Sequence, residues 1–225
     1  MKTLIFFLSI LVVGSLQAQT INFNIEGVIQ KPKNAKYTYL VSNSNKANGN
    51  DDLFMVTPLK GNKFKIAGKS NLNGQLLRKA FVFLDESGTI TLADVKSKIK
   101  QKAWFVGSSA NLKSVYLEDA KFDMENPYNI KDAKIISGGT YLNQSEEFML
   151  ALRNRKILGF VKKNPDSPAA LLEIDRLLRL FEFRKNRLEA DFSSPTELFS
   201  ALSPRLKNTK QGIALKQKIE KAKKK

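Results

Sequence analysis

Residues 21–28 read INFNIEGV, and this stretch sets the expectation for the N-terminal half of the chain. Apolar and polar residues alternate through it with a period of two. Successive side chains of a β-strand point to opposite faces, so one face of this strand is expected to enter a core while the other meets water.

Similar runs follow at short intervals, separated by turn-forming pairs such as Asn48-Gly49 and Asn73-Gly74. Gly and Asn tolerate the positive φ angles that tight turns require. Many short strands at this spacing are typical of antiparallel sandwiches and barrels. We therefore predict a β-sandwich-like domain over residues 19–142. Its further strands are expected at residues 36–41, 53–57, 64–67, 80–84, 89–92, 103–106, 114–117 and 133–136.

The pattern changes to helical spacing near Ser145. This serine precedes two glutamates and is expected to cap a helix that continues to Val161. Ser167 and Pro168 predict the start of a second helix, because a serine caps well and proline fits the first helical position. The apolar residues of this second helix form a broad surface, which the β domain, neighbouring helices or another chain must cover.

Two further helices are expected near the C-terminus. Residues 194–197, SPTE, match a capping box with proline at the first helical position, and a last helix is expected from about Thr209. Residues 143–225 are thus predicted to be all helical. The predicted fold class is α+β, an antiparallel β-sandwich-like domain followed by a helical segment.

Residues 1–18 resemble a secretory signal peptide. A short positive start precedes the apolar run LIFFLSILVVG at residues 4–14, and Ala18 suits the position before a cleavage site. The apolar run is shorter than the roughly 20 residues that span a membrane. We expect an exported, soluble protein in the periplasm or on the cell surface, with no transmembrane segment after cleavage.

The chain of 225 residues contains no Cys and no His. Disulfides, thiolate metal sites, cysteine nucleophiles and imidazole acid-base catalysis are therefore excluded. No catalytic residue, metal ligand or cofactor site is predicted, and the protein is expected not to be an enzyme. A carboxylate-dependent hydrolase or a glycan-binding protein remains an alternative, on the acidic groups Asp51-Asp52, Asp85-Glu86 and Glu118-Asp119 with Asp123 and Glu125.

The net charge is +17, with the basic excess spread over both halves of the chain. Nucleic-acid binders more often concentrate such charge on one patch with interleaved aromatics, so nucleic acid is not an expected partner. A lysine-rich C-terminal tail is the one dense basic run, and an alternative function is the binding of anionic surfaces through it. The candidate binding residues are Trp104, as a ligand platform, and Lys216, Lys218, Lys221, Lys223, Lys224 and Lys225.

Several segments, taken in order, resemble the N-terminal half of exported TlpA-like thiol:disulfide oxidoreductases of Gram-negative bacteria. They are FNIEG (23–27), YL (39–40), GNKFKIAG (61–68), IKDAKIISG (130–138), FVKKNPDSP (160–168), LFSALS (198–203) and LKNTKQG (206–212). In that family a β-rich domain of unknown function and a helical segment precede a thioredoxin domain with a Cys-x-x-Cys motif.

The resemblance implies a binding role and not the redox activity. Thiol-disulfide exchange needs a thiolate, and this chain has no cysteine, so no catalytic residue of the family is carried over. We expect an exported, non-enzymatic binding or docking module of the bacterial envelope. Its expected partner is an envelope protein, and a separate thioredoxin-like protein is one candidate. The sequence leaves the oligomeric state open.

Overall fold

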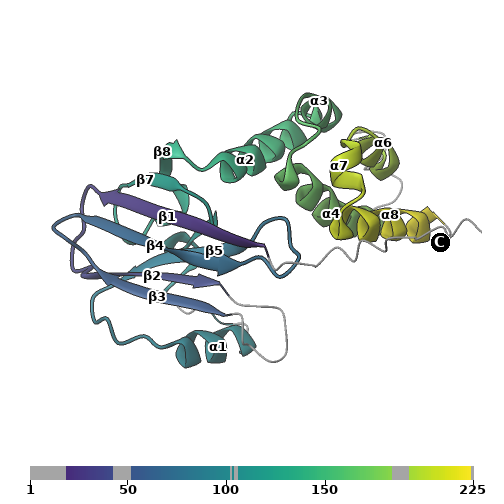
Figure 1. Cartoon of the computed structure of the whole chain (residues 1–225). Helices are drawn as coiled ribbons and strands as arrows, with labels where there is room; N and C mark the ends of the chain where they lie inside the picture. Colours follow the sequence, from purple (N-terminus) through teal and green to yellow (C-terminus); the bar gives the residue numbers. More distant parts are fainter. Residues whose placement is uncertain (1–18, 43–51, 102, 104–105, 184–192, 224–225) are drawn as a thin grey trace, which may run out of the picture.

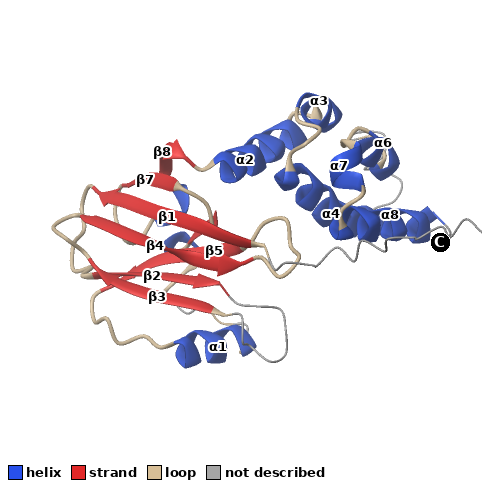
Figure 2. Cartoon of the chain, in the orientation of Figure 1, coloured by secondary structure: helices blue, strands red, loops and turns tan. Residues whose placement is uncertain are grey.

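The computed structural model describes residues 19–42, 52–101, 103, 106–183 and 193–223. It has an α+β fold, with eight strands followed by helices at the C-terminus (Figures 1 and 2). The predicted fold class is confirmed. The expected signal peptide, Trp104, and half of the expected strand at 103–106 lie outside the described residues.

The first sheet has the strand order β4-β1-β7-β8. Its strands are β1 (Thr20–Ile29), β4 (Lys63–Asn71), β7 (Ala120–Met124) and β8 (Lys134–Gly138). The pairs β1–β4 and β7–β8 are antiparallel, whereas β1 and β7 pair in parallel. Strand β7 was not among the expected strands, although its residues alternate in burial as a half-buried strand does.

The second sheet is antiparallel throughout, with the order β3-β2-β5-β6. Its strands are β2 (Tyr37–Ser42), β3 (Leu53–Pro58), β5 (Lys79–Asp85) and β6 (Lys113–Tyr116). Apolar side chains from both sheets fill one core, as in a sandwich. Fully or nearly fully buried members of this core include Phe23, Ile25, Leu40, Val82, Phe122 and Met124.

Helix α1 (Leu92–Lys100) lies beside the second sheet (Figure 1). The expected strand at 89–92 is therefore wrong. Thr91 instead caps α1, because its hydroxyl accepts from Asp94 N while the Asp94 carboxylate accepts from Thr91 N. The sequence itself indicates this cap, because Thr91 and Asp94 have the spacing of a capping box.

Six described helices make up the C-terminal part: α2 (Thr140–Arg153), α3 (Ile157–Lys163), α4 (Pro168–Phe183), α6 (Pro195–Ser200), α7 (Pro204–Lys207) and α8 (Lys210–Lys223). Helix α4 contacts α2, α6 and α8, so these neighbouring helices cover much of its apolar surface. A second core forms there, including Phe148, Val161, Leu171, Ile174, Leu198 and Leu215.

The predicted helix caps have mixed outcomes. Ser167 caps α4 by accepting from Ala170 N at 3.1 Å, and Ser194 forms the expected capping box with Glu197. The expected cap at Ser145 is wrong, since α2 already begins at Thr140. The expected continuous helix to Val161 is also wrong, because Arg155 has a φ of 57° between α2 and α3.

The sandwich and the helices are joined through α2 and α4. Leu142 and Ala169 belong to the sandwich core although they lie in helices. Glu118 accepts hydrogen bonds from Tyr141 N and Leu142 N, both at 3.0 Å, in the first turn of α2. A carboxylate from the sandwich therefore satisfies amide groups that a helix leaves free at its start. The division into domains at residue 142 stays a prediction.

Candidate ligand-binding pocket

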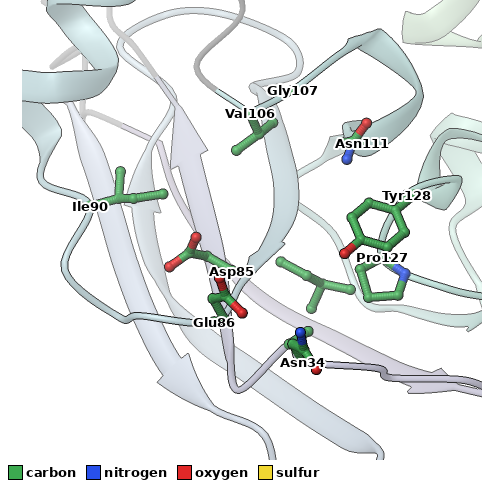
Figure 3. A pocket seen from close by; sticks show the side chains of 11 residues that line it. Asn34, Asp85, Glu86, Ile90, Val106, Gly107, Asn111, Pro127 and Tyr128 are labelled. Atoms are coloured by element: carbon green, nitrogen blue, oxygen red, sulfur yellow. The ribbon is translucent and has the colours of Figure 1, made fainter.

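A hollow of about 340 Å³ opens at one end of the sandwich, and we call it the sandwich-end pocket (Figure 3). Its volume lies at the lower end of the range of small-molecule sites, about 300–1,000 Å³. Four separate segments contribute to it: the β1–β2 connection, the end of β5, the loop before β6 and the loop after β7. The lining residues are Asn34, Ala35, Leu84, Asp85, Glu86, Ile90, Val106, Gly107, Asn111, Pro127 and Tyr128.

Asp85, at the end of β5, is held in place by the turn that follows it. Its Oδ2 accepts from Ser87 N at 2.8 Å, from Ser87 Oγ at 2.6 Å and from Gly88 N at 3.1 Å. Burial raises the pKa of Asp85, but these hydrogen bonds outweigh it and leave the pKa below its ordinary value. The carboxylate is therefore ionised and fixed at neutral pH.

Tyr128 forms an exposed wall of the pocket, with 56% of its surface accessible. Its backbone N donates to Asn126 Oδ1 at 2.9 Å, and the preceding Pro127 is buried. The ammonium of Lys33 lies 4.6 Å from the centroid of the Tyr128 ring, a cation–π distance. This aromatic ring already has a cationic neighbour within the chain.

Two amide side chains complete the polar lining. Asn111 accepts from Ser108 Oγ at 2.7 Å, which orients its amide, whereas Asn34 is exposed on the β1–β2 connection. Among the described residues no Lys or Arg lines the pocket, in a chain that carries 38 of them. The lining thus combines two carboxylates, two amides and an aromatic ring on an apolar floor, a composition that suits binding of a polar ligand.

Catalysis by two facing carboxylates is not favoured by this geometry. Asp85 and Glu86 are consecutive, and the Asp85 carboxylate already accepts three hydrogen bonds. Glycosidases need two carboxyls across a substrate, one of them with a raised pKa. Among described residues, no group of three or more Asp or Glu side chains is arranged to hold a metal ion.

Buried ionisable groups elsewhere take part in structural contacts. Lys113 in β6 donates to the carbonyls of Lys131 and Ala133 at 3.2 and 2.9 Å, and contacts Glu146 of α2 at 3.3 Å. Burial raises the pKa of Tyr116 to about 12, so this phenol stays protonated at neutral pH. Lys113 thus links the sandwich to α2, and neither Lys113 nor Tyr116 lines the pocket.

The predicted lysine site is only partly assembled. In α8, Lys216 pairs with Glu220 at 3.9 Å and Lys218 pairs with Asp175 of α4 at 2.5 Å, so both are engaged within the chain. Lys221 and Lys223 are exposed. Trp104, Lys224 and Lys225 lie outside the described residues.

Sequence reasoning named Asp85 and Glu86 but missed their neighbours in the pocket. Tyr128 lies in a loop and Asn111 in a short 3-10 helix before β6, and no local pattern indicates that the fold brings these segments together. The Asn-Pro-Tyr sequence at 126–128 offered one usable signal, because Asn and Pro favour turns and surface loops often carry binding residues.

No described helix has the length and apolar character needed to cross a membrane. Comparisons of the chain with family models, with curated proteins and with solved structures find no match. The resemblance to TlpA-like proteins therefore stays a prediction.

Proposed function

We propose that this protein is an exported, non-enzymatic binding module of the bacterial cell envelope, and that the sandwich-end pocket holds its ligand or a side chain of its partner. The observation that carries the proposal is the pocket lining. Fixed polar groups surround an aromatic wall, while the Asp85 carboxylate is engaged in hydrogen bonds and has a lowered pKa.

The scaffold around the pocket supports a binding role. Gln30 N donates to Met124 O at 2.8 Å and Lys31 N donates to Glu125 O at 2.9 Å, which joins the β1–β2 connection to β7. Lys36 N donates to Asp85 O at 2.9 Å. Loops tied down in this way lose little conformational entropy when a ligand binds.

Export is supported by the leader-like residues 1–18. The chain has no cysteine, so it cannot carry out thiol-disulfide exchange itself. A separate thioredoxin-like protein of the envelope remains the candidate partner that the resemblance implies. The proposal requires that the partner engages the sandwich-end pocket.

The test captures partners from native envelope extract after brief crosslinking, with the chain from Gln19 as bait. The variant Tyr128→Ala removes the aromatic wall. Leu150→Ala is the matched control, since Leu150 is equally exposed at 57% but lies in α2. We expect one salt-resistant species with the wild type and the control, and its loss with Tyr128→Ala. Equal capture by all three baits would overturn the proposal.

A further inference from the structure

The β3–β4 turn places two lysines directly opposite each other. Lys60 N donates to Lys63 O at 2.8 Å and Lys63 N donates to Lys60 O at 3.2 Å, around a turn in which Gly61 has a φ of 64°. Residues paired in this way carry their side chains on the same face, with Cβ atoms about 4.5–5.5 Å apart. The two ammonium groups therefore share one region of the surface.

These like charges have no compensating carboxylate of their own. Among the described residues, no ion pair involves Lys60 or Lys63, and both side chains are exposed. Like charges directly opposite each other destabilise a strand pair. An anion bound between them would remove this repulsion.

A hollow of about 490 Å³ lies at this turn, and we call it the turn hollow. Its lining residues are Glu26, Thr57, Pro58, Lys60, Lys63, Phe64 and Lys65. Lys65 pairs with Glu26 at 3.1 Å, and Glu26 also accepts from Asn24 Nδ2 at 3.0 Å. The single carboxylate of the hollow is thus neutralised locally, which leaves the region with a net positive charge.

The turn hollow continues into a basic sheet face. On the outer face of the first sheet, the strand register places Glu26 between Lys65 of β4 and Lys121 of β7, and Asp123 beside Lys134 of β8. Lys69 extends the row along β4. An excess of one charge sign over such a face attracts oppositely charged ligands and raises their association rate.

We propose that the turn hollow binds the phosphate group of an anionic ligand between Lys60 and Lys63. Phosphate carries several acceptor oxygens and more than one negative charge, so it can accept from several ammonium groups at once. The inference does not rest on the proposed function, because it concerns a different hollow and different residues, although both hollows lie at the same end of the sandwich.

The test measures binding of inorganic pyrophosphate to the whole chain from Gln19 by calorimetry at low ionic strength. The variant K60Q/K63Q removes the opposed pair. The control K98Q/K100Q removes the same net charge from exposed lysines at the end of α1. We expect K60Q/K63Q to weaken binding about three- to ten-fold, the loss expected for two exposed charge contacts, and the control to change it less than about two-fold.

The same variants distinguish the source of the phosphate. Vesicles of phosphatidylcholine with and without phosphatidylglycerol test a lipid headgroup by co-sedimentation. Selective loss of vesicle binding with K60Q/K63Q assigns the phosphate to a lipid, and selective loss of pyrophosphate binding alone assigns it to a free ligand.

Thermal unfolding of K60Q/K63Q shows whether a loss of binding comes from a loss of folded protein. K60Q/K63Q is expected to be at least as stable as the wild type, since it removes the repulsion between the two lysines. Equal losses in K60Q/K63Q and K98Q/K100Q, or no binding of either probe to the wild type, would overturn the inference.

Discussion

Ser145 of α2 donates a hydrogen bond from its hydroxyl to Oε1 of Glu173 in α4, over 2.7 Å. Glu173 is only 3% exposed, and its Oε2 accepts from Arg176 Nε at 2.6 Å. Lys79 of β5 places its ammonium 4.0 Å from the same carboxylate. Glu173 thus connects two helices with the sandwich. Ser145, the residue expected to cap a helix, instead binds this buried acid.

Removing either partner of this contact should lower the free energy of unfolding. We expect a loss of about 1 kcal/mol for Ser145→Ala and about 1–3 kcal/mol for Glu173→Ala, because buried polar groups lose their hydrogen bonds. The effects of the two changes should not add, since they remove one shared contact. Urea unfolding of Ser145→Ala, Glu173→Ala and the double variant measures the three free energies, with the exposed Glu147→Ala as control. A double variant whose loss equals the sum of the two single losses would contradict a shared contact between Ser145 and Glu173.

Glu118 should make stability depend on pH in a defined direction. Burial raises the pKa of Glu118 above its ordinary value of 4.5, despite its hydrogen bonds to the backbone of α2. A carboxyl with a raised pKa holds its proton more tightly when folded, so its contribution is full below pH 4.5 and declines as pH rises through the raised value. Relative to Glu118→Gln, the wild type should therefore lose stability as pH rises from 4.5.

Urea unfolding of the wild type and Glu118→Gln at several pH values measures this difference. A difference that is constant with pH, or one that grows in favour of the wild type as pH rises, would show that burial does not dominate at Glu118.

Two helical glycines should respond in opposite ways to alanine. A Cβ at Gly212 in α8 would lie 2.2 Å from the carbonyl oxygen of Leu206, whereas a Cβ at Gly159 in α3 meets nothing within 4 Å. We expect Gly212→Ala to lower the unfolding free energy by about 2 kcal/mol or more, because α7 must shift. Gly159→Ala should raise it by about 0.4–1 kcal/mol, since alanine favours the helix.

Thermal unfolding of the two variants side by side is the measurement. Equal effects would mean that α7 and α8 do not approach each other as closely as the structure has them.

Local signals predicted local structure well. The capping motifs at Ser167 and Ser194 and the alternation of residues 21–28 depend on neighbours within a few residues, and the structure confirms them. The start of α2 was missed because its cap comes from Glu118, more than 20 residues earlier in the chain. A cap supplied by tertiary structure leaves no signal in a local window.

Pairings between strands that lie far apart in the sequence could not be predicted either. Strand β7 pairs in parallel with β1, nearly a hundred residues away, and a parallel pair needs no adjacent turn that would mark it. The sandwich-end pocket depends on the same long-range arrangement, since Asn34, Asp85, Asn111 and Tyr128 come from four segments. Asp85 and Glu86 could be named from the sequence, but the residues from the other segments that line the pocket with them could not.

Site-specific photocrosslinking can detect a ligand or partner that occupies the sandwich-end pocket. A photoreactive phenylalanine analogue replaces Tyr128 in one variant and Leu150 in another, both in the full chain expressed in cells. We predict a discrete crosslinked species from position 128 that is absent from position 150. Crosslinks from position 150 alone, or the same species from both positions, would contradict binding at this pocket.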